Sequence, residues 1–321
     1  MWAKSCSPYE RCFPLVVMST GGSPLASSRP ALESAPCRSY STMQTPATTL
    51  ESFLHQNELH HITPIKVLGL FGSRLRSVPL RVADETAYLL WSRRHASQYD
   101  SAKYPTADVV FYPALDVAPT PAMLNVCARA ILDEAGGRTF VVKTIEARLL
   151  DALRVAAPAA RFSYERALCT FTVAGDAAVQ SPATTAILAA RQIRATTTLT
   201  DEAQPLLDAH NVYSASELQT MFADGNGRCL VSVDGDRAVA VALSFPNSSS
   251  LYEIGSLYVS PDARRCGHAS ALVRAALADL AARGLAVRYV VDATNAPSIA
   301  LAERCGLREV MRLEHWLVAD A

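Results

Sequence analysis

The stretch VSPDARRCGHA, residues 259–269, places two arginines and a glycine between a strand-like run and a helix-like run. A strand that ends here and a helix that begins near Gly267 would bring several backbone N–H groups and the positive end of a helix dipole to one place. Such a place suits a phosphate. Gly267 and Ala269 would let a ligand approach the backbone, and Arg264 and Arg265 would add charge for a pyrophosphate. The alternative is a surface loop with incidental arginines.

The elements around this stretch follow the order of a layered α/β fold. LYEIGSLYV (251–259) indicates a strand, residues 270–284 an amphipathic helix that stops at Gly284, and VRYVVDA (287–293) a buried strand. Two short helices and a hairpin are expected ahead of them, and a short helix and a strand behind them. The second half is therefore predicted to run strand, two helices, three antiparallel strands, helix, strand, helix, strand.

The first half repeats this order at nearly the same lengths, which indicates an internal duplication. Strand, helix, strand, helix and strand are expected at 107–115, 121–137, 138–144, 145–156 and 160–173. The connection after the first of these strands, ALDVAPTPAM, offers no glycine or arginine for a diphosphate. We predict an α/β (α+β layered) fold with a mixed, mostly antiparallel sheet flanked by helices, built from tandem domains.

Two motifs in the second half resemble those of the GNAT superfamily of acyl-CoA N-acyltransferases. Residues 264–269 spell Arg-x-x-Gly-x-Ala after Val-x-Pro at 259–261, similar to the Q/R-x-x-G-x-G/A signature of that family. NAPSIALAERCGL (295–307) resembles its N-x-x-A-x-x-L-Y-x-x-x-G-F segment. The resemblance covers about residues 186–321, and the glycine N-acyltransferase-like branch is the most similar.

The resemblance implies a site for coenzyme A, with acetyl-CoA as co-substrate and no metal. The strands at 251–259 and 287–293 would splay apart, and the pantetheine arm would pair with the freed backbone. The pyrophosphate would lie on the loop that follows, with two further residues on the other side of the arm. The cofactor-binding residues implied are Leu257, Tyr258, Val259, Arg264, Arg265, Gly267, His268, Ala269, Asn295 and Ser298.

The resemblance also gives Glu253 the role of catalytic base. Glu253 lies six residues before Val259, at the position of the glutamate base in histone-acetylating members. An alkyl ammonium, with a pKa near roughly 10.4, is no nucleophile until a group takes its proton. A carboxylate on a mostly apolar strand facing a cleft is expected to have a raised pKa suited to that task, directly or through water. The alternative is an exposed strand glutamate paired with an arginine.

Ala302 departs from the family pattern, because many members have a tyrosine there that protonates the departing thiolate. Either the thiolate takes its proton from water, or the domain is degenerate. Cys266, Cys305 and Tyr258 lie near the inferred site, where we interpret their side chains as packing residues rather than reactive groups.

Composition and charge narrow the classes of partner. The 321 residues are 50% apolar and carry 30 basic and 30 acidic side chains, so we expect neither nucleic acid nor membrane as a partner. No run approaches the roughly 18 to 20 apolar residues that span a bilayer. Eight cysteines without a CxxC pair are interpreted as reduced intracellular thiols, and His60 and His61 as helix-surface residues without metal-ligand partners.

Residues 1–45 are rich in Ser and Pro, and their interpretation stays open. The RSYS at 38–41 resembles a mitochondrial processing site, but five prolines prevent a long amphipathic helix. The segment is either an import signal of a mitochondrial protein or a disordered extension of a cytoplasmic one, with Met18 or Met43 as the real start.

We therefore expect an acetyl-CoA-dependent N-acetyltransferase that acts on the amine of a small molecule or peptide. The amine would attack the thioester directly, with the carbonyl polarised by a backbone N–H near Tyr258 or Val259. The catalytic domain would span 186–321, and 46–180 would be a GNAT-like domain without a pyrophosphate loop. The alternative is a non-catalytic acyl-CoA-binding or scaffold protein.

Overall fold

The computed structural model describes residues 49–173, 192–210, 215–222 and 225–319. The expected leader at 1–45 and the expected domain boundary at 180–186 lie outside these residues. Within them, no helix is long and apolar enough to cross a membrane.

Ten helices and strands make up the described first half. They are α1 (Leu50–His55), α2 (Ile62–Phe71), β1 (Arg76–Val82), β2 (Glu85–Arg93), α3 (Gln98–Lys103), β3 (Val109–Ala114), α4 (Pro121–Ala135), β4 (Phe140–Thr144), α5 (Ala147–Ala156) and β5 (Arg161–Val173). Short 3₁₀ turns, η1 (Gly72–Arg74) and η2 (Arg94–Ala96), lie among them.

The described second half has the element order that the sequence predicts. Its elements are β6 (Ile193–Thr196), α7 (Gln204–His210), α8 (Ala215–Phe222), β7 (Arg228–Asp234), β8 (Arg237–Pro246), β9 (Leu251–Val259), α9 (His268–Ala282), β10 (Ala286–Asp292), α10 (Ala296–Arg304) and β11 (Leu307–Ala319), with the 3₁₀ turn η3 (Pro261–Ala263) after β9.

Both halves run two helices, three strands, helix, strand, helix and strand, although the first half adds α3 before β3 and the second begins with β6. Several equivalent elements also match in length. Strands β1 and β7 have 7 residues each, helices α4 and α9 have 15, and strands β5 and β11 have 13. In both halves a helix joins two parallel strands, β3 to β4 and β9 to β10. This correspondence supports the internal duplication.

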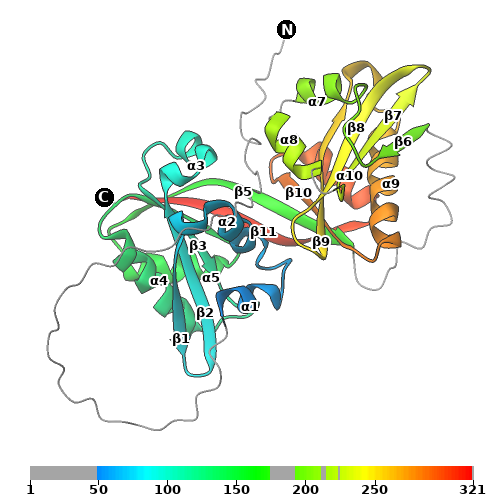
Figure 1. Cartoon of the computed structure of the whole chain (residues 1–321). Coiled ribbons are helices and arrows are strands. Elements are labelled where there is room, and N and C mark those ends of the chain that lie inside the picture. Colours follow the sequence, from blue (N-terminus) through cyan, green and yellow to red (C-terminus); the bar gives the residue numbers. More distant parts are fainter. Residues whose placement is uncertain (1–48, 174–191, 211–214, 223–224, 320–321) are drawn as a thin grey trace, which may run out of the picture.

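All described strands belong to one mixed sheet, in the order β1-β2-β3-β4-β11-β5-β10-β9-β8-β7-β6. At its centre β5 and β11 pair antiparallel from Leu307–Val173 to Ala319–Arg161. Outward, β11 pairs with β4 and β5 pairs with β10, so each half inserts its last strand into the sheet of the other (Figure 1). The division into domains at 46–180 and 186–321 stays a prediction. In the sheet, β4 of the first half lies beside β11 of the second, and β10 of the second half lies beside β5 of the first.

Helices cover both faces of the sheet because the strands alternate apolar residues between two cores. On one face, α4 and α5 pack on the first half and α9 and α10 on the second. On the other, α1 and α2 pack on the first half and α7 and α8 on the second. On this second face, polar residues replace apolar ones between the α1–α2 pair and the α7–α8 pair. The candidate site lies there.

Candidate active site

Strands β9 and β10 part after four residue pairs, which confirms the expected splaying. Their register runs from Leu251–Ala286 to Ile254–Tyr289, and β10 then continues to Asp292 paired only with β5 on its other edge. A bulge in β9 accompanies the separation, because Ser256 has φ +47° and the register with β8 shifts there. The end of β9, including Leu257, Tyr258 and Val259, therefore has its β10-facing backbone edge available to a ligand.

The loop after β9 leads into the N-terminus of α9 as the sequence indicates. Gly267 is the N-cap, and its φ of 90° lies in the left-handed region that favours glycine. Arg265 is exposed and also left-handed, with φ +64°. The Arg264 side chain is exposed, but its Nε donates to the Val259 carbonyl at 3.1 Å, which ties it back to the strand. The loop thus offers backbone N–H groups at a helix start with two cationic side chains beside them.

The imidazole of His268 does not face the loop, so the prediction that His268 binds the cofactor rests on its backbone N–H. The ring is buried, and its Nδ1 lies 2.9 Å from Ser232 Oγ on β7. Only the backbone N–H of His268 remains as a donor toward a ligand at the helix start. Ala269 is half-buried and packs against the core of this half.

Asn295 and Ser298 stand where α10 begins, across the splay from β9. Asn295 caps α10, with its Oδ1 accepting from the Ser298 N–H at 3.2 Å, and Ser298 Oγ lies 2.6 Å from the Tyr289 hydroxyl. Both residues line the cavity described below. Ala302, one turn further along α10, is fully buried in the core and does not line it.

A cavity of about 280 Å³ lies between the two halves. The polar residues of its lining come from α2, α3, β3, β4 and β5 of the first half and from α7, β9, β10, α10 and β11 of the second. Among them are Lys66, Tyr99, Asp100, Tyr112, Lys143, Arg166, Glu253, Ser256, Arg288, Asp292, Asn295, Ser298 and His315.

Glu253 lines this cavity, but its surroundings are more cationic than the sequence suggests. Its Oε2 accepts from Lys66 Nζ at 2.8 Å, Asn247 Nδ2 at 2.9 Å and Arg288 Nη1 at 3.0 Å. Burial alone would raise the pKa of Glu253, but the charges of Lys66 and Arg288 and these hydrogen bonds lower it to about 2. The expectation of a raised pKa is wrong, and the carboxylate is ionised at neutral pH.

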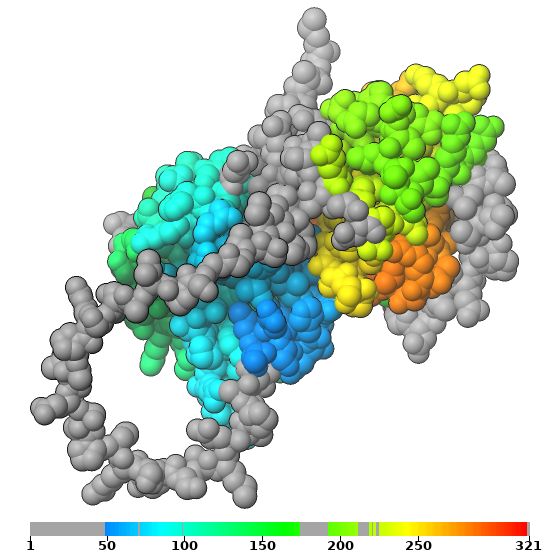
Figure 2. Space-filling view, in the orientation of Figure 1, coloured from blue at the N-terminus to red at the C-terminus, as the bar shows by residue number. Residues whose placement is uncertain are grey.

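Lys66, which the sequence reasoning missed, reaches Glu253 from α2 of the other half. Burial lowers the pKa of Lys66 to about 8, although the neighbouring carboxylate opposes that change. The contact belongs to an interface where Glu58 also accepts from the hydroxyls of Ser248 and Ser250. In Figure 2 the blue surface of the first half meets the yellow surface of the second at this interface.

A second group of charges occupies the cavity wall formed by the first half. Lys143 Nζ donates to Asp100 Oδ1 at 2.6 Å, and Tyr112 donates to Asp100 Oδ2 at 2.9 Å. Arg166 donates to the Tyr99 hydroxyl at 2.8 Å and to the Asp292 carboxylate of β10. One signal for this group is present in the sequence: the short strand FVVKT is buried throughout, so its Lys143 must have a buried partner.

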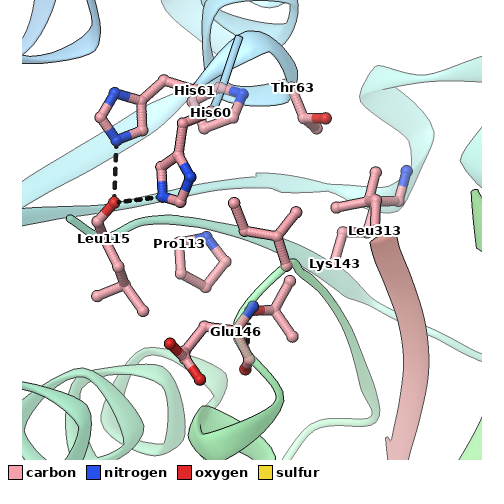
Figure 3. Close-up of a pocket in the computed structure, with 11 residues that line it drawn as sticks. His60, His61, Thr63, Pro113, Leu115, Lys143, Glu146 and Leu313 are labelled. Carbon is pink, nitrogen blue, oxygen red and sulfur yellow. Dashed lines mark hydrogen bonds between the residues drawn. The ribbon is translucent and has the colours of Figure 1, made fainter. Parts of the chain in front are cut away.

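The corresponding cleft of the first half is closed by its own chain (Figure 3). Strands β3 and β4 also part, after Phe111–Val142, but the Leu115 carbonyl beyond β3 contacts His60 Nε2 at 3.2 Å and His61 Nε2 at 2.9 Å. The space left is about 20 Å³, enough for one water. The interpretation of both histidines as helix-surface residues is wrong: they lie in the turn between α1 and α2, and His61 is 4% exposed.

Residues 193–307 match a family model described as the acetyltransferase (GNAT) family. The matched stretch begins with β6 and ends where β11 begins, so it contains the splayed strands, the loop before α9 and α10. It is a GNAT domain, and the resemblance seen in the motifs is confirmed at the level of this superfamily. Residues before 193 lie outside the match.

The chain is also similar to several solved structures of low identity. An acetyltransferase of the GNAT family from Colwellia psychrerythraea is 10% identical with a TM-score of 0.49, over 84% of this chain and 97% of that one. A tandem GNAT protein from the clavulanic acid biosynthesis pathway is 13% identical with a TM-score of 0.47, over 80% and 87%. A GCN5-related N-acetyltransferase from Sphaerobacter thermophilus is 17% identical with a TM-score of 0.46, over 75% and 83%. None of the curated proteins matches the chain.

Proposed function

We propose that the protein is an acetyl-CoA-dependent N-acetyltransferase with one active site, in its second half. The observation that carries this proposal is the free edge of β9, which has the Gly267 loop at one end and the 280 Å³ cavity at the other. A long, thin cofactor with an anionic end and a reactive end fits this arrangement. The closed cleft of the first half supports a single site for each chain.

The residues present fit coenzyme A. The pyrophosphate would be held by the backbone N–H groups of Gly267, His268 and Ala269, with Arg265 and Arg264 as the nearest cations. The pantetheine arm would pair with β9 at Leu257, Tyr258 and Val259, opposite Asn295 and Ser298. Bound there, acetyl-CoA would supply an activated acetyl group at the mouth of the cavity.

The Glu253–Lys66 pair is the proposed proton acceptor. A carboxylate with a pKa of about 2 is too weak a base for an amine, whereas Lys66, with a pKa of about 8, matches the task near neutral pH. In the proposed step, the amine nitrogen forms a bond to the acetyl carbonyl carbon, and the carbon–sulfur bond breaks. The proton of the amine passes to Nζ of the unprotonated form of Lys66, which is the minor form at pH 7 for a pKa of about 8. The same Nζ can return the proton to the thiolate that leaves. This would supply the acid that a tyrosine at Ala302 provides in other members of the superfamily.

Calorimetry with coenzyme A tests the site. Gly267→Asp puts a side chain and a negative charge against the pyrophosphate, so affinity should fall by about tenfold or more, which is about 1.4 kcal/mol. Gly284→Asp is the matched control, because Gly284 lies at the other end of α9, also has positive φ, and a Cβ there meets nothing within 4 Å. Equal affinity of a folded Gly267→Asp variant and wild type would remove the loop from the site.

Turnover separates an enzyme from an acyl-CoA-binding scaffold. Purified protein with acetyl-CoA and a pooled panel of amines should release coenzyme A faster than the same mixture without amines. Mass spectrometry of the pool would identify the acetylated product. Tight binding of acetyl-CoA without any acetylated amine across the panel would favour the scaffold.

A further inference from the structure

Lysine is rare in this chain, and two of its lysines line the cavity. Only four of the 30 basic residues are lysines, at positions 4, 66, 103 and 143, and the others are arginines. Among the three lysines that the structure describes, Lys66 and Lys143 line the cavity and Lys103 does not. An arginine stays protonated in proteins, whereas a lysine can become a neutral amine and react. The cavity therefore holds two of the few primary amines of this protein.

Lys143 is held firmly in the cavity wall. Its Nζ donates to Asp100 Oδ1 at 2.6 Å and lies 5.2 Å from the ring centres of Tyr99 and Tyr112. Its side chain is 8% exposed. A carboxylate and the faces of aromatic rings all attract a cation, so these contacts stabilise the ammonium group where it is. We interpret Lys143 as a structural cation.

Lys66 faces a less favourable set of charges. Its Nζ donates to Glu253 Oε2 at 2.8 Å, but the same oxygen atom also accepts from Arg288 Nη1 at 3.0 Å. The guanidinium of Arg288 repels a second cation at this carboxylate. Burial, aided by Arg288, lowers the pKa of Lys66 to about 8, although Glu253 opposes that change. Roughly a tenth of Lys66 is therefore the neutral, nucleophilic amine at pH 7.

The proposed path of the cofactor ends in the space that Lys66 lines. Strand β9 contributes both Leu257, a proposed contact of the pantetheine arm, and Glu253, the partner of Lys66, to the cavity lining. The Lys66 side chain is 15% exposed, and its flexible stem lets the amine move once it leaves Glu253. A cavity of about 280 Å³ also has room for an acetyl group on that amine. A nucleophile and a thioester held in one cavity react faster than the same groups in solution.

We propose that Lys66 is a site of self-acetylation, modified when acetyl-CoA is bound and no acceptor amine occupies the cavity. In this step the neutral Nζ of Lys66 forms a bond to the acetyl carbonyl carbon, and the carbon–sulfur bond breaks. The thiolate of coenzyme A takes the proton that the nitrogen loses. An acetylated Lys66 is an amide and no longer accepts a proton, so the modification would stop turnover. The inference rests on the proposed function, because that function brings acetyl-CoA to the cavity.

Isotope labelling of the full-length chain tests the proposal. The protein is incubated in an amine-free buffer with acetyl-CoA that carries a ¹³C-labelled acetyl group, and each lysine is followed by peptide mass spectrometry. We expect Lys66 to be labelled about tenfold or more faster than Lys103 and Lys143. The rate constant should not depend on protein concentration, since Lys66 would react inside its own chain. Equal labelling of the three lysines, or a rate constant that rises with protein concentration, would overturn the proposal.

A shortened thioester separates the reaction at the site from ordinary chemical acetylation. S-acetyl-N-acetylcysteamine has the same reactive group but no pyrophosphate, so at equal concentration it should label Lys66 about tenfold or more slowly than acetyl-CoA does. Gly267→Asp should slow labelling by acetyl-CoA below saturation and leave labelling by the short thioester unchanged. Gly284→Asp, the matched control, should change neither rate. Equal rates with the two thioesters on the wild-type protein would mean that no bound cofactor is involved, which contradicts the proposal.

Variants and acceptors show what the modification does. Lys66→Arg keeps a cation beside Glu253 but offers no amine that can be acetylated, so the label at this position should disappear. An amine that the enzyme acetylates should protect Lys66, and protein labelled at Lys66 should have lost turnover in proportion to the labelled fraction. Labelled Lys66 without any acetylated amine would still support the self-acetylation. Acetylated amines with Lys66 unmodified, even before the amines are added, would overturn it and leave the proposed function in place.

Discussion

Glu253 keeps its negative charge because Lys66 and Arg288 both donate to one of its oxygen atoms. Glu253 and Arg288 are buried, and Lys66 is half-buried. The three residues come from different elements, β9, β10 and α2. Removing the carboxylate would leave two cations facing each other in a site with little water. The loss of one partner from a buried ionic group is strongly destabilising, whereas the loss of a balanced pair costs less.

Glu253→Gln should therefore reduce stability as well as activity. We expect its free energy of unfolding, measured by urea denaturation, to fall by about 3 kcal/mol or more. The double variant Lys66→Met/Glu253→Gln removes one charge of each sign and should recover a substantial part of that loss. A Glu253→Gln protein as stable as wild type would mean that the group is not an ionic cluster in solution.

The same cluster should make stability fall in acid. An unfolded Glu253 takes up a proton near pH 4.5, whereas the folded one stays ionised until about pH 2. Between these values the unfolded state binds more protons, so the stabilisation that is complete above pH 4.5 is lost as the pH falls toward 2. Lys66→Met removes one of the charges that hold the folded pKa down, so its stability should depend less on pH in this window. Equal slopes for the two proteins in urea titrations would contradict the role of Lys66.

At the scale of elements, the bulge in β9 is what turns the strand end away from β10. Ser256 adopts φ +47°, which is unfavourable for a residue with a Cβ, and its hydroxyl is buried without a partner among the described residues. Ser256→Gly should be neutral or stabilise the protein by about 0.5 to 1 kcal/mol, because glycine accepts this conformation. Ser256→Val should destabilise it and weaken coenzyme A, because a β-branched residue resists positive φ. Thermal unfolding and calorimetry would measure both, and a well-tolerated valine would show that the bulge can be lost without effect.

Order and type of the elements could be predicted for 107–173 and for the second half because local signals encode them. The apolar stripe that ends at Gly284 specifies α9, and Gly267, between Arg264 and α9, marks the loop that precedes this helix. The pairing of β5 with β11 could not be predicted, because a strand that alternates apolar and polar residues can bury its apolar face beside many different neighbouring strands. Lys66 was missed for the same reason, because 187 residues of chain separate it from Glu253. The strand end and the loop before α9 were therefore predictable, and the side of the candidate site that both halves build was not.

For the whole molecule, the exchanged strands predict that the halves depend on each other. Segments 46–180 and 186–321, produced as separate chains in one cell, should assemble one to one, because β5 and β11 pair along 13 residues each. Each segment produced alone should aggregate, since its last strand would expose both of its edges. Affinity purification through a tag on one segment, followed by light scattering, would measure the stoichiometry. A soluble, monomeric 186–321 segment that binds coenzyme A would contradict this dependence.

The exchange of β5 and β11 also affects how independently the sequences of the two halves can evolve. Two identical copies of such a unit, each lending its last strand to the other, would form the same central pair as a symmetric dimer, and any substitution would then alter both clefts at once. Joining the copies in one chain removes that constraint. One cleft can be filled by His60 and His61 while the other keeps its loop, and the half that no longer needs a cleft of its own can specialise in supplying Lys66 and Arg166 to its neighbour.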